Sequence, residues 1–270
     1  MSSKLFAPGY PRNSDGWILF PRDTEYRGQL FPNLVKHPAK NNLYMMEAII
    51  DYITTPESIL LDPMAGTGSL MIAASKVKRV ILIELEKVFA DNIRQHKPLF
   101  GENITILEGD CRKVLPLAPI VNTIIFSPPY GQTLLRGNLD ELEADTAPPD
   151  NYRSWDRWKT AGVADYAAHP DNISRLAEFW QWIALEDVYT KCAASLVPGG
   201  HLVLITKDHY KADERVQWAL MHHRRCIKAG LVPTDWFKRE AIGSYFGRFL
   251  LSKGIKQATD EDIMIFRKPS

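Results

Sequence analysis

A glycine loop between an apolar strand and an Ala-rich helix constrains the fold of this chain more than any other feature. Residues 59–74 read ILLDPMAGTGSLMIAA, so a buried strand ends at Asp62, a loop follows, and a helix begins. Gly66 and Gly68 let the loop turn tightly and let a ligand approach its backbone without meeting a side chain. This order of strand, glycine loop and helix is the context of a nucleotide-binding turn.

The sequence of the loop narrows the class of ligand. It lacks the Gly-Lys-Ser/Thr ending of a phosphate-binding P-loop, and it lacks the full three-glycine fingerprint of a dinucleotide site. A ligand without phosphates is therefore expected rather than ATP.

Acids follow the next two strands. The next strand ends in Glu84, sixteen positions after Gly68, and an acid near that spacing commonly binds the hydroxyls of a ribose. Glu84 is favoured over Glu86, which belongs to the following helix. For either acid, the simpler interpretation is a solvated residue that suits the helix dipole. The strand at 104–107 is followed by Asp110, which could accept a hydrogen bond from the amino group of an adenine ring.

Strands and helices alternate up to Ser127, which predicts a parallel sheet with covering helices. The 270 residues can form one large α/β domain with a substantial core. The last two strands are expected to form an antiparallel pair. Helices are expected at 42–54, 173–196 (with Leu176, Phe179, Ile183 and Val188 on one face) and 214–229, and strands at 59–62, 79–84, 104–107, 124–126, 201–206, 231–237 and 262–266.

A second motif stands at the end of a strand. Residues 124–131 read IIFSPPYG, in which an apolar run suits a buried strand and two prolines stop the ladder, because neither can donate a backbone hydrogen bond. Ser127, Pro128, Pro129 and Tyr130 form a rigid cluster of acceptors beside an aromatic ring. Such a cluster at a strand end suits a planar base that bears an amino group. Alone, the tetrapeptide would suit a proline-rich surface turn equally well.

Together the motifs resemble those of the S-adenosylmethionine-dependent methyltransferases that modify exocyclic amino groups of DNA bases. Residues 62–69 are similar to their cofactor loop, and residues 127–130 are similar to their catalytic motif. The segment at 36–40 resembles the part that closes over the methionine end of the cofactor, although without the other motifs it would be an ordinary polar loop. This order of segments is one of the family's known permutations.

The resemblance implies a Rossmann-like α/β methyltransferase fold, a mostly parallel seven-stranded sheet with helices on both faces, and S-adenosyl-L-methionine as the cofactor. Catalytic residues are then expected at Ser127, Pro128, Pro129 and Tyr130. Cofactor-binding residues are expected at His37, Pro38, Ala39, Lys40, Asp62, Met64, Ala65, Gly66, Gly68, Ser69, Glu84, Asp110, Cys111 and Ser127. No metal is expected, and Cys111 is interpreted as a small loop residue rather than as a nucleophile.

The expected reaction is methylation of an amino group on a base flipped out of double-stranded DNA. The Pro128 carbonyl and the Ser127 side chain would accept hydrogen bonds from the two N–H groups of the target amino group, which localises the lone pair of its nitrogen. Tyr130 would stack on the base. Serine at the first motif position is commoner in relatives that modify cytosine N4, which favours cytosine over adenine N6. Adenine, an RNA base, and an inactive cofactor-binding module that regulates a partner stay open as alternatives.

Two segments interrupt the strand–helix rhythm. Residues 1–35 contain four prolines and are expected to form an irregular arm. Residues 131–172 are first acidic and then aromatic, and their position after the catalytic motif makes them the candidate target-recognition region over the active site. Trp155 and Trp158 could equally pin this insertion onto the domain. Many restriction-associated relatives carry a separate recognition domain, and none is evident here.

The composition of the chain excludes few classes of function. The 33 Lys and Arg against 32 Asp and Glu give a net charge of +1, so a basic surface for nucleic acid would have to be local. No stretch is apolar enough to cross a membrane, and the start lacks the core of a signal peptide. Three widely spaced cysteines suit neither a disulfide framework nor a zinc site, so a reducing cytoplasm is expected.

Overall fold

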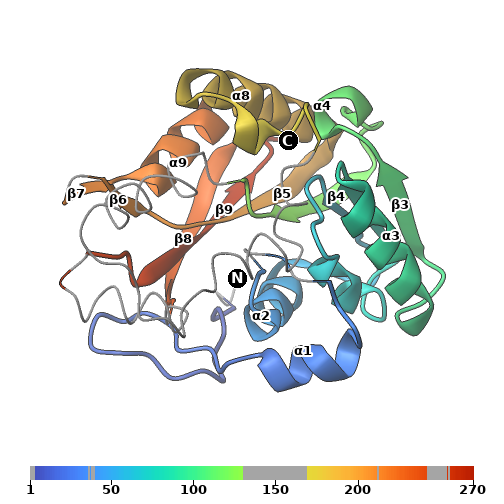
Figure 1. Ribbon diagram of the computed structural model, residues 1–270, viewed down its shortest axis with the longest axis horizontal. Helices are drawn as coiled ribbons and strands as arrows, with labels where there is room; N and C mark the ends of the chain where they lie inside the picture. Colours follow the sequence, from blue (N-terminus) through green and yellow to red (C-terminus); the bar gives the residue numbers. More distant parts are fainter. Residues whose placement is uncertain are drawn as a thin grey trace, which may run out of the picture.

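A seven-stranded sheet forms the centre of the molecule in the computed structural model, which describes residues 4–35, 37, 40–129, 169–211, 213–241, 254 and 256–270. The strand order is β3-β2-β1-β4-β5-β9-β8 (Figure 1). These strands are β1 (Ile59–Asp62), β2 (Arg79–Glu84), β3 (Ile104–Glu108), β4 (Val121–Phe126), β5 (Leu196–Thr206), β8 (Val232–Glu240) and β9 (Asp260–Arg267).

Most of the sheet is parallel. The pairs among β1 to β5 are all parallel, whereas β9 runs antiparallel to both β5 and β8. The mostly parallel, seven-stranded α/β sheet predicted from the sequence is therefore confirmed, and so is the antiparallel pair formed by its last two strands.

The strand order reverses beside β1. The chain adds β2 and β3 on one side of β1 and then returns to add β4 and β5 on the other side. Loops that leave two such neighbouring strands diverge and open a crevice at the carboxyl edge of the sheet. The loops after Asp62 and after Phe126 therefore border the same crevice.

Helices cover both faces of the sheet (Figure 1). Alternate residues of β2 enter different cores: Val80 and Leu82 pack in one, and Ile81 lies in the other. Such two-sided burial is typical of a parallel strand. The first face carries α1 (Thr24–Leu30), α2 (Leu43–Ile53), α3 (Lys87–His96) and the short 3-10 helices η1 (Ser69–Ala73) and η2 (Lys97–Leu99), and the second carries α4 (Cys111–Val114), η4 (Ile173–Arg175), α8 (Glu178–Ser195) and α9 (Trp218–Lys228).

The helix predicted over 42–54 is confirmed as α2. The Asn42 side chain caps it by accepting a hydrogen bond from the backbone N–H of Met45 at 3.0 Å. Leu43, Met46 and Ile50 form an apolar stripe at helical spacing and are buried in the first core. A good cap and a buried stripe together explain why this segment is helical.

The N-terminal segment is more ordered than predicted. Within residues 1–35, α1 forms a helix, and Ile18 makes isolated bridges with Arg12 and Arg239. Phe6 and Phe31 are buried in the first core, so the prolines of this segment do not keep it from packing on the domain.

The helix after the glycine loop is shorter than predicted. Only the five-residue 3-10 helix η1 follows Gly68, where the sequence predicts an Ala-rich helix. The next strand begins at Arg79, which leaves ten residues for the whole connection. The remainder of that connection is needed to lead the chain back to the start of β2.

The apolar face predicted for the 173–196 helix is partly wrong. Phe179 and Ile183 are 67% and 46% exposed, and Trp180 is exposed as well. The buried face instead contains Trp182, whose ring centre lies 4.3 Å from that of Trp218 on α9. Apolar residues occur nearly all round the first turns of α8, so their spacing does not select the buried side; packing against α9 does.

Two boundaries also differ. The helix predicted from residue 214 begins only at Trp218, because β7 (Glu214–Val216) pairs with β6 (His209–Lys211) in a small hairpin. The strand predicted at 201–206 begins earlier, at Leu196, and its pairing with β4 shifts register. Across the described ranges, no helix is both long and apolar enough to cross a membrane.

Candidate active site

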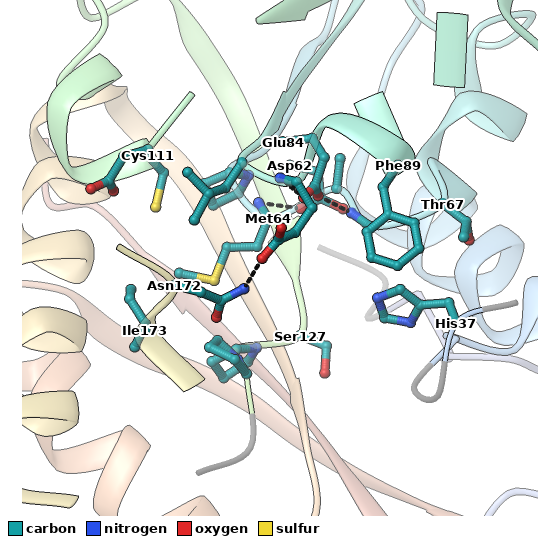
Figure 2. Close-up of a pocket in the computed structure, with 18 of the residues that line it drawn as sticks. His37, Asp62, Met64, Thr67, Glu84, Phe89, Cys111, Ser127, Asn172 and Ile173 are labelled. Atoms are coloured by element: carbon teal, nitrogen blue, oxygen red, sulfur yellow. Dashed lines mark hydrogen bonds between the residues drawn. The ribbon is translucent and has the colours of Figure 1, made fainter. Parts of the chain in front are cut away.

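A pocket opens at the carboxyl ends of β1, β2 and β4, where the reversal of strand order leaves a crevice (Figure 2). His37 and Phe89 lie on one side of it, and Asn172 and Ile173 lie on the other (Figure 2). It is lined by His37, Lys40, Asn41, residues 62–67, Ser69, residues 84–86, Phe89, residues 109–111, residues 127–129 and residues 171–173.

The structure brings most of the predicted site residues to this one pocket. Gly68 is an exception, since it does not line the pocket, and Pro38, Ala39 and Tyr130 lie outside the described residues. The predicted residues that line the pocket are His37, Lys40, Asp62, Met64, Ala65, Gly66, Ser69, Glu84, Asp110, Cys111, Ser127, Pro128 and Pro129.

The glycine loop has the backbone that its sequence predicts. Gly66 and Gly68 adopt left-handed φ values of 53° and 79°, which other residues rarely tolerate. A Cβ added to Gly66 would lie 3.2 Å from Nε2 of His37, and one added to Gly68 would lie 2.9 Å from Cε of Met71. The first glycine therefore keeps the loop open toward the pocket, and the second permits the turn into η1.

Two buried carboxyl groups stand at the ends of β1 and β2. Asp62 accepts a hydrogen bond from the backbone N–H of Met64 at 2.9 Å. Glu84 accepts from the backbone N–H groups of Gly66 at 2.6 Å and Glu86 at 2.8 Å, so it ties the glycine loop to β2. Burial raises the pKa of Asp62 to about 7 and that of Glu84 to about 8. Both groups thus favour a ligand that offers them hydrogen-bond donors or positive charge.

Asp110 is held in place by Arg112, two positions further along the chain. Its carboxylate caps α4 by accepting from the backbone N–H of Arg112 at 2.9 Å, and it also accepts from the guanidinium of Arg112 at 2.8 to 3.1 Å. The neighbouring Cys111 thiol is buried, and burial raises its pKa to about 12. It therefore stays protonated near neutral pH, which disfavours a role as a nucleophile, although Cys111 is the first residue of α4 and not the loop residue predicted from the sequence.

Sequence reasoning missed one wall of the pocket. Glu86, interpreted as a helix-start acid, is 5% exposed and accepts hydrogen bonds from the Asn172 side chain at 2.6 Å and the His169 backbone N–H at 3.1 Å. The guanidinium of Arg112 donates to the Asp171 carbonyl at 2.6 Å. We call residues 169–173 the return segment. It lies at the end of the predicted 131–172 insertion, and no local sequence signal links it to Glu86, 86 positions before Asn172.

The motif after β4 reaches the pocket with its first three residues. Pro128 is buried, whereas Ser127 and Pro129 are partly exposed at the pocket. The Gln181 side chain on α8 donates a hydrogen bond from Nε2 to the Pro129 carbonyl at 3.0 Å. Among the described residues, no group of three or more His, Cys, Asp and Glu side chains could hold a metal ion.

Two solved structures share the fold. TrmN from Thermus thermophilus aligns with a TM-score of 0.52 and 17% identity over 86% of this chain, and this chain spans 50% of the TrmN chain. The N-methyltransferase NodS from Bradyrhizobium japonicum WM9, in complex with S-adenosyl-L-homocysteine, aligns with a TM-score of 0.53 and 13% identity over 93% of this chain and 100% of that one. At these identities, the similarity establishes the Rossmann-like methyltransferase fold.

Two comparisons of the amino-acid sequence complement the comparison of structures. A search of curated proteins found no match to this chain. A family model described as DNA methylase does match, and the match covers the N-terminal segment from residue 8 onward, the glycine loop and Glu84. Over residues 8–95 the chain thus matches the DNA methylase family, as its resemblance to the amino-methyltransferases of DNA predicts.

Proposed function

We propose that the chain is an S-adenosylmethionine-dependent methyltransferase that methylates the exocyclic amino group of a DNA base. One observation carries this proposal: the acceptor motif that begins at Ser127 opens onto the same pocket as the glycine loop and Glu84. A pocket with a cofactor loop at one strand end and an amino-group acceptor at the neighbouring one suits transfer between two bound reactants. The match of residues 8–95 to a DNA methylase family supports DNA as the substrate class.

The residues present fit this cofactor, which supplies a methyl group on a positively charged sulfonium. Glu84 would hold the ribose hydroxyls, and Asp62, buried beside the glycine loop, would offer negative charge to the methionine end. Asp110 would accept from the adenine amino group. The ring of His37 lies 4.8 Å from that of Phe89 and over Gly66, so it would close the pocket on that side.

The chain's own role in catalysis would be to prepare the amino nitrogen. An amino group conjugated to a base is a poor nucleophile, because its lone pair is spread into the ring. The Pro128 carbonyl and the Ser127 hydroxyl would accept hydrogen bonds from its two N–H groups and so localise the lone pair on the nitrogen. When the new N–C bond forms, the bond that breaks would be the one between the methyl carbon and the sulfonium sulfur, and the proton that the nitrogen loses would pass to water. Tyr130 would stack on the flipped base.

Cytosine N4 is the target that we propose. The supporting feature is Ser127, because a neutral hydroxyl at the first motif position is commoner in relatives that modify cytosine. Adenine N6 is the second candidate, since the same acceptor geometry would serve its amino group. The insertion at 131–172 would supply much of the recognition of DNA.

Identification of the product tests the proposed reaction, the class of nucleic acid and the target base. The protein would be incubated with unmethylated genomic DNA or with RNA and labelled S-adenosylmethionine, and the nucleosides would be identified by mass spectrometry after digestion. We expect N4-methylcytosine from DNA. N6-methyladenine as the sole product would overturn the choice of base, and label confined to RNA would overturn DNA. Cofactor binding without any transfer would favour a regulatory module.

A further inference from the structure

Gln181 is the polar residue of α8 that contacts the proposed catalytic motif. Its side chain is 1% exposed, and Nε2 donates to the Pro129 carbonyl at 3.0 Å from 52 positions along the chain. The helix hydrogen bond from its own N–H to the Ala177 carbonyl, at 2.9 Å, fixes it in the first turns of α8. The contact therefore ties a rigid helix to the loop that leaves β4.

The burial of this amide calls for an explanation. Its neighbours on the buried face of α8 are mostly apolar, among them Trp182, Leu185 and Val188. Its Oε1 has no hydrogen-bond partner within the described ranges, and a buried acceptor without a partner destabilises the fold. An apolar residue of similar length would avoid that cost, so the folded structure alone gives no reason for glutamine here.

The Pro129 carbonyl does not depend on Gln181 to have a hydrogen-bond donor. Pro129 is partly exposed at the pocket, where water could donate to its oxygen equally well. What water cannot provide is a fixed direction. The amide donor on a packed helix can, because its position is set by the core around it.

A fixed direction matters at this position in the chain. The proline rings fix φ at residues 128 and 129, and each proline also restricts ψ of the residue before it, so ψ of Pro129 is the main freedom left in this part of the backbone. A hydrogen bond to the Pro129 carbonyl sets that torsion and with it the peptide plane that leads to Tyr130. It also engages the Pro129 oxygen and leaves the Pro128 carbonyl, which accepts no hydrogen bond from the described residues, as the acceptor.

We infer that Gln181 is a positioning residue for methyl transfer: through its hydrogen bond to Pro129, it orients the acceptor motif toward the target base. The inference rests on the proposed function, because it assigns Gln181 to the base side of that same site. Gln181 would touch neither the cofactor nor the base. Its loss should therefore slow transfer without weakening cofactor binding.

Two variants test the inference. Gln181→Met keeps the length of the side chain and removes both the donor and the unpartnered oxygen. Gln181→Glu keeps the shape, but a neutral carboxyl in this buried position could still donate from its O–H, so this variant is assayed at alkaline pH, where the ionised carboxylate has no donor. We expect the single-turnover rate of methyl transfer to unmethylated genomic DNA to fall by about 10- to 100-fold in both, as for a small misplacement of a reacting group. The affinity for S-adenosylhomocysteine by calorimetry should equal that of the wild type, and the melting temperature of Gln181→Met should not fall.

The matched control is Gln95→Met, the same substitution at an exposed position of α3, which should leave every readout unchanged. A wild-type rate in Gln181→Met overturns the inference, and so does an equal loss of cofactor affinity and rate, which would indicate a structural role. If Gln181→Met does not fold, Gln181→Glu decides by the same criteria. Failure of the wild type to methylate any nucleic acid would instead refute the proposed function.

Discussion

Asp62 and Glu84 control how the pocket responds to pH at the scale of single residues. Burial raises the pKa of Asp62 from 3.8 to about 7 and that of Glu84 from 4.5 to about 8. Each group is therefore neutral in the folded protein over a pH range in which it is ionised in the unfolded chain. The stability that this proton confers is present at low pH and is lost as pH rises toward the folded pKa.

The first prediction concerns Asp62→Asn, which should stabilise the protein at alkaline pH. The amide can still accept from Met64, and it has no charge to bury. We expect its advantage in free energy of unfolding over the wild type to grow by roughly 2–3 kcal/mol between about pH 5 and about pH 8. Denaturant titrations at the two pH values measure this, with the exposed Glu57→Gln as the control. An advantage that does not change with pH would contradict the raised pKa.

Gly66→Val should abolish cofactor binding while the fold survives. The backbone at Gly66 has a φ of 53°, and a side chain there would enter the pocket within 3.2 Å of the His37 ring. Calorimetry with S-adenosylhomocysteine and circular dichroism would separate binding from folding. Gly28→Ala, in α1 where no atom lies within 4 Å of an added Cβ, is the control and should bind normally. Unchanged affinity in Gly66→Val would exclude this loop as the cofactor site.

Tyr130→Ala should lose turnover and keep cofactor affinity, because the ring is proposed to meet the base. Removing a base–aromatic stack costs about 1–3 kcal/mol, which corresponds to a loss of roughly 5- to 150-fold in the single-turnover rate. Tyr130→Phe retains a stacking ring and should stay close to the wild type. Normal transfer by the alanine variant would refute the stacking role.

At the scale of elements, the return segment is the part of the pocket that depends on a distant partner. Its contacts join Glu86, the N-cap residue of α3, and Arg112 on α4 to a stretch at the end of the insertion. Ile173 is buried among the residues of the second core, so this wall is anchored by packing as well as by hydrogen bonds. The carboxylate of Glu86 is the component that one substitution can remove without opening a cavity.

Glu86→Gln should weaken cofactor binding. Charge-assisted hydrogen bonds contribute about 1.5–3 kcal/mol each, and the amide cannot accept from both partners equally, so we expect an affinity loss of roughly 10- to 100-fold for S-adenosylhomocysteine. The control is Glu108→Gln, which removes a carboxylate from the more exposed ion pair with Arg94. Equal affinities in the two variants would show that the return segment does not shape the cofactor pocket.

At the scale of the whole molecule, the proposed division of labour is that the sheet binds the cofactor and the insertion recognises DNA. The chain enters the insertion after Pro129, which is fixed to Gln181, and the last part of the insertion begins at His169, which is fixed to Glu86. Both ends therefore meet the core at the pocket. The net charge of +1 offers no general attraction for a polyanion, so recognition must be local.

Replacement of residues 131–168 by a Gly/Ser linker should separate these activities. We expect the shortened protein to bind S-adenosylhomocysteine with nearly the affinity of the wild type and to lose measurable binding to duplex DNA in a gel-shift assay. A linker variant that still binds and methylates DNA would assign recognition to another part of the surface.

Much of the fold was available from local sequence. The apolar runs that end at Asp62 and Glu84 became β1 and β2, and Asn42 caps α2 as its residue type suggests. The glycine loop was readable because a left-handed turn beside a ligand has few alternatives to glycine. Each of these features depends on residues close together in the chain, where periodicity and turn chemistry act directly.

Other features of the molecule depend on residues that are far apart in the sequence and meet only in the folded chain. The buried side of α8 was set by packing on α9, because the apolar residues of α8 surround its first turns. Glu86 and Gln181 acquired their partners, Asn172 and Pro129, across 86 and 52 positions. Such contacts arise from how helices pack on the sheet, and no periodicity or turn signal in the neighbouring residues encodes them. Local patterns along the chain thus predict the strands of the central sheet and the motifs at their ends, whereas the packing of helices on that sheet selects the side chains that support those motifs.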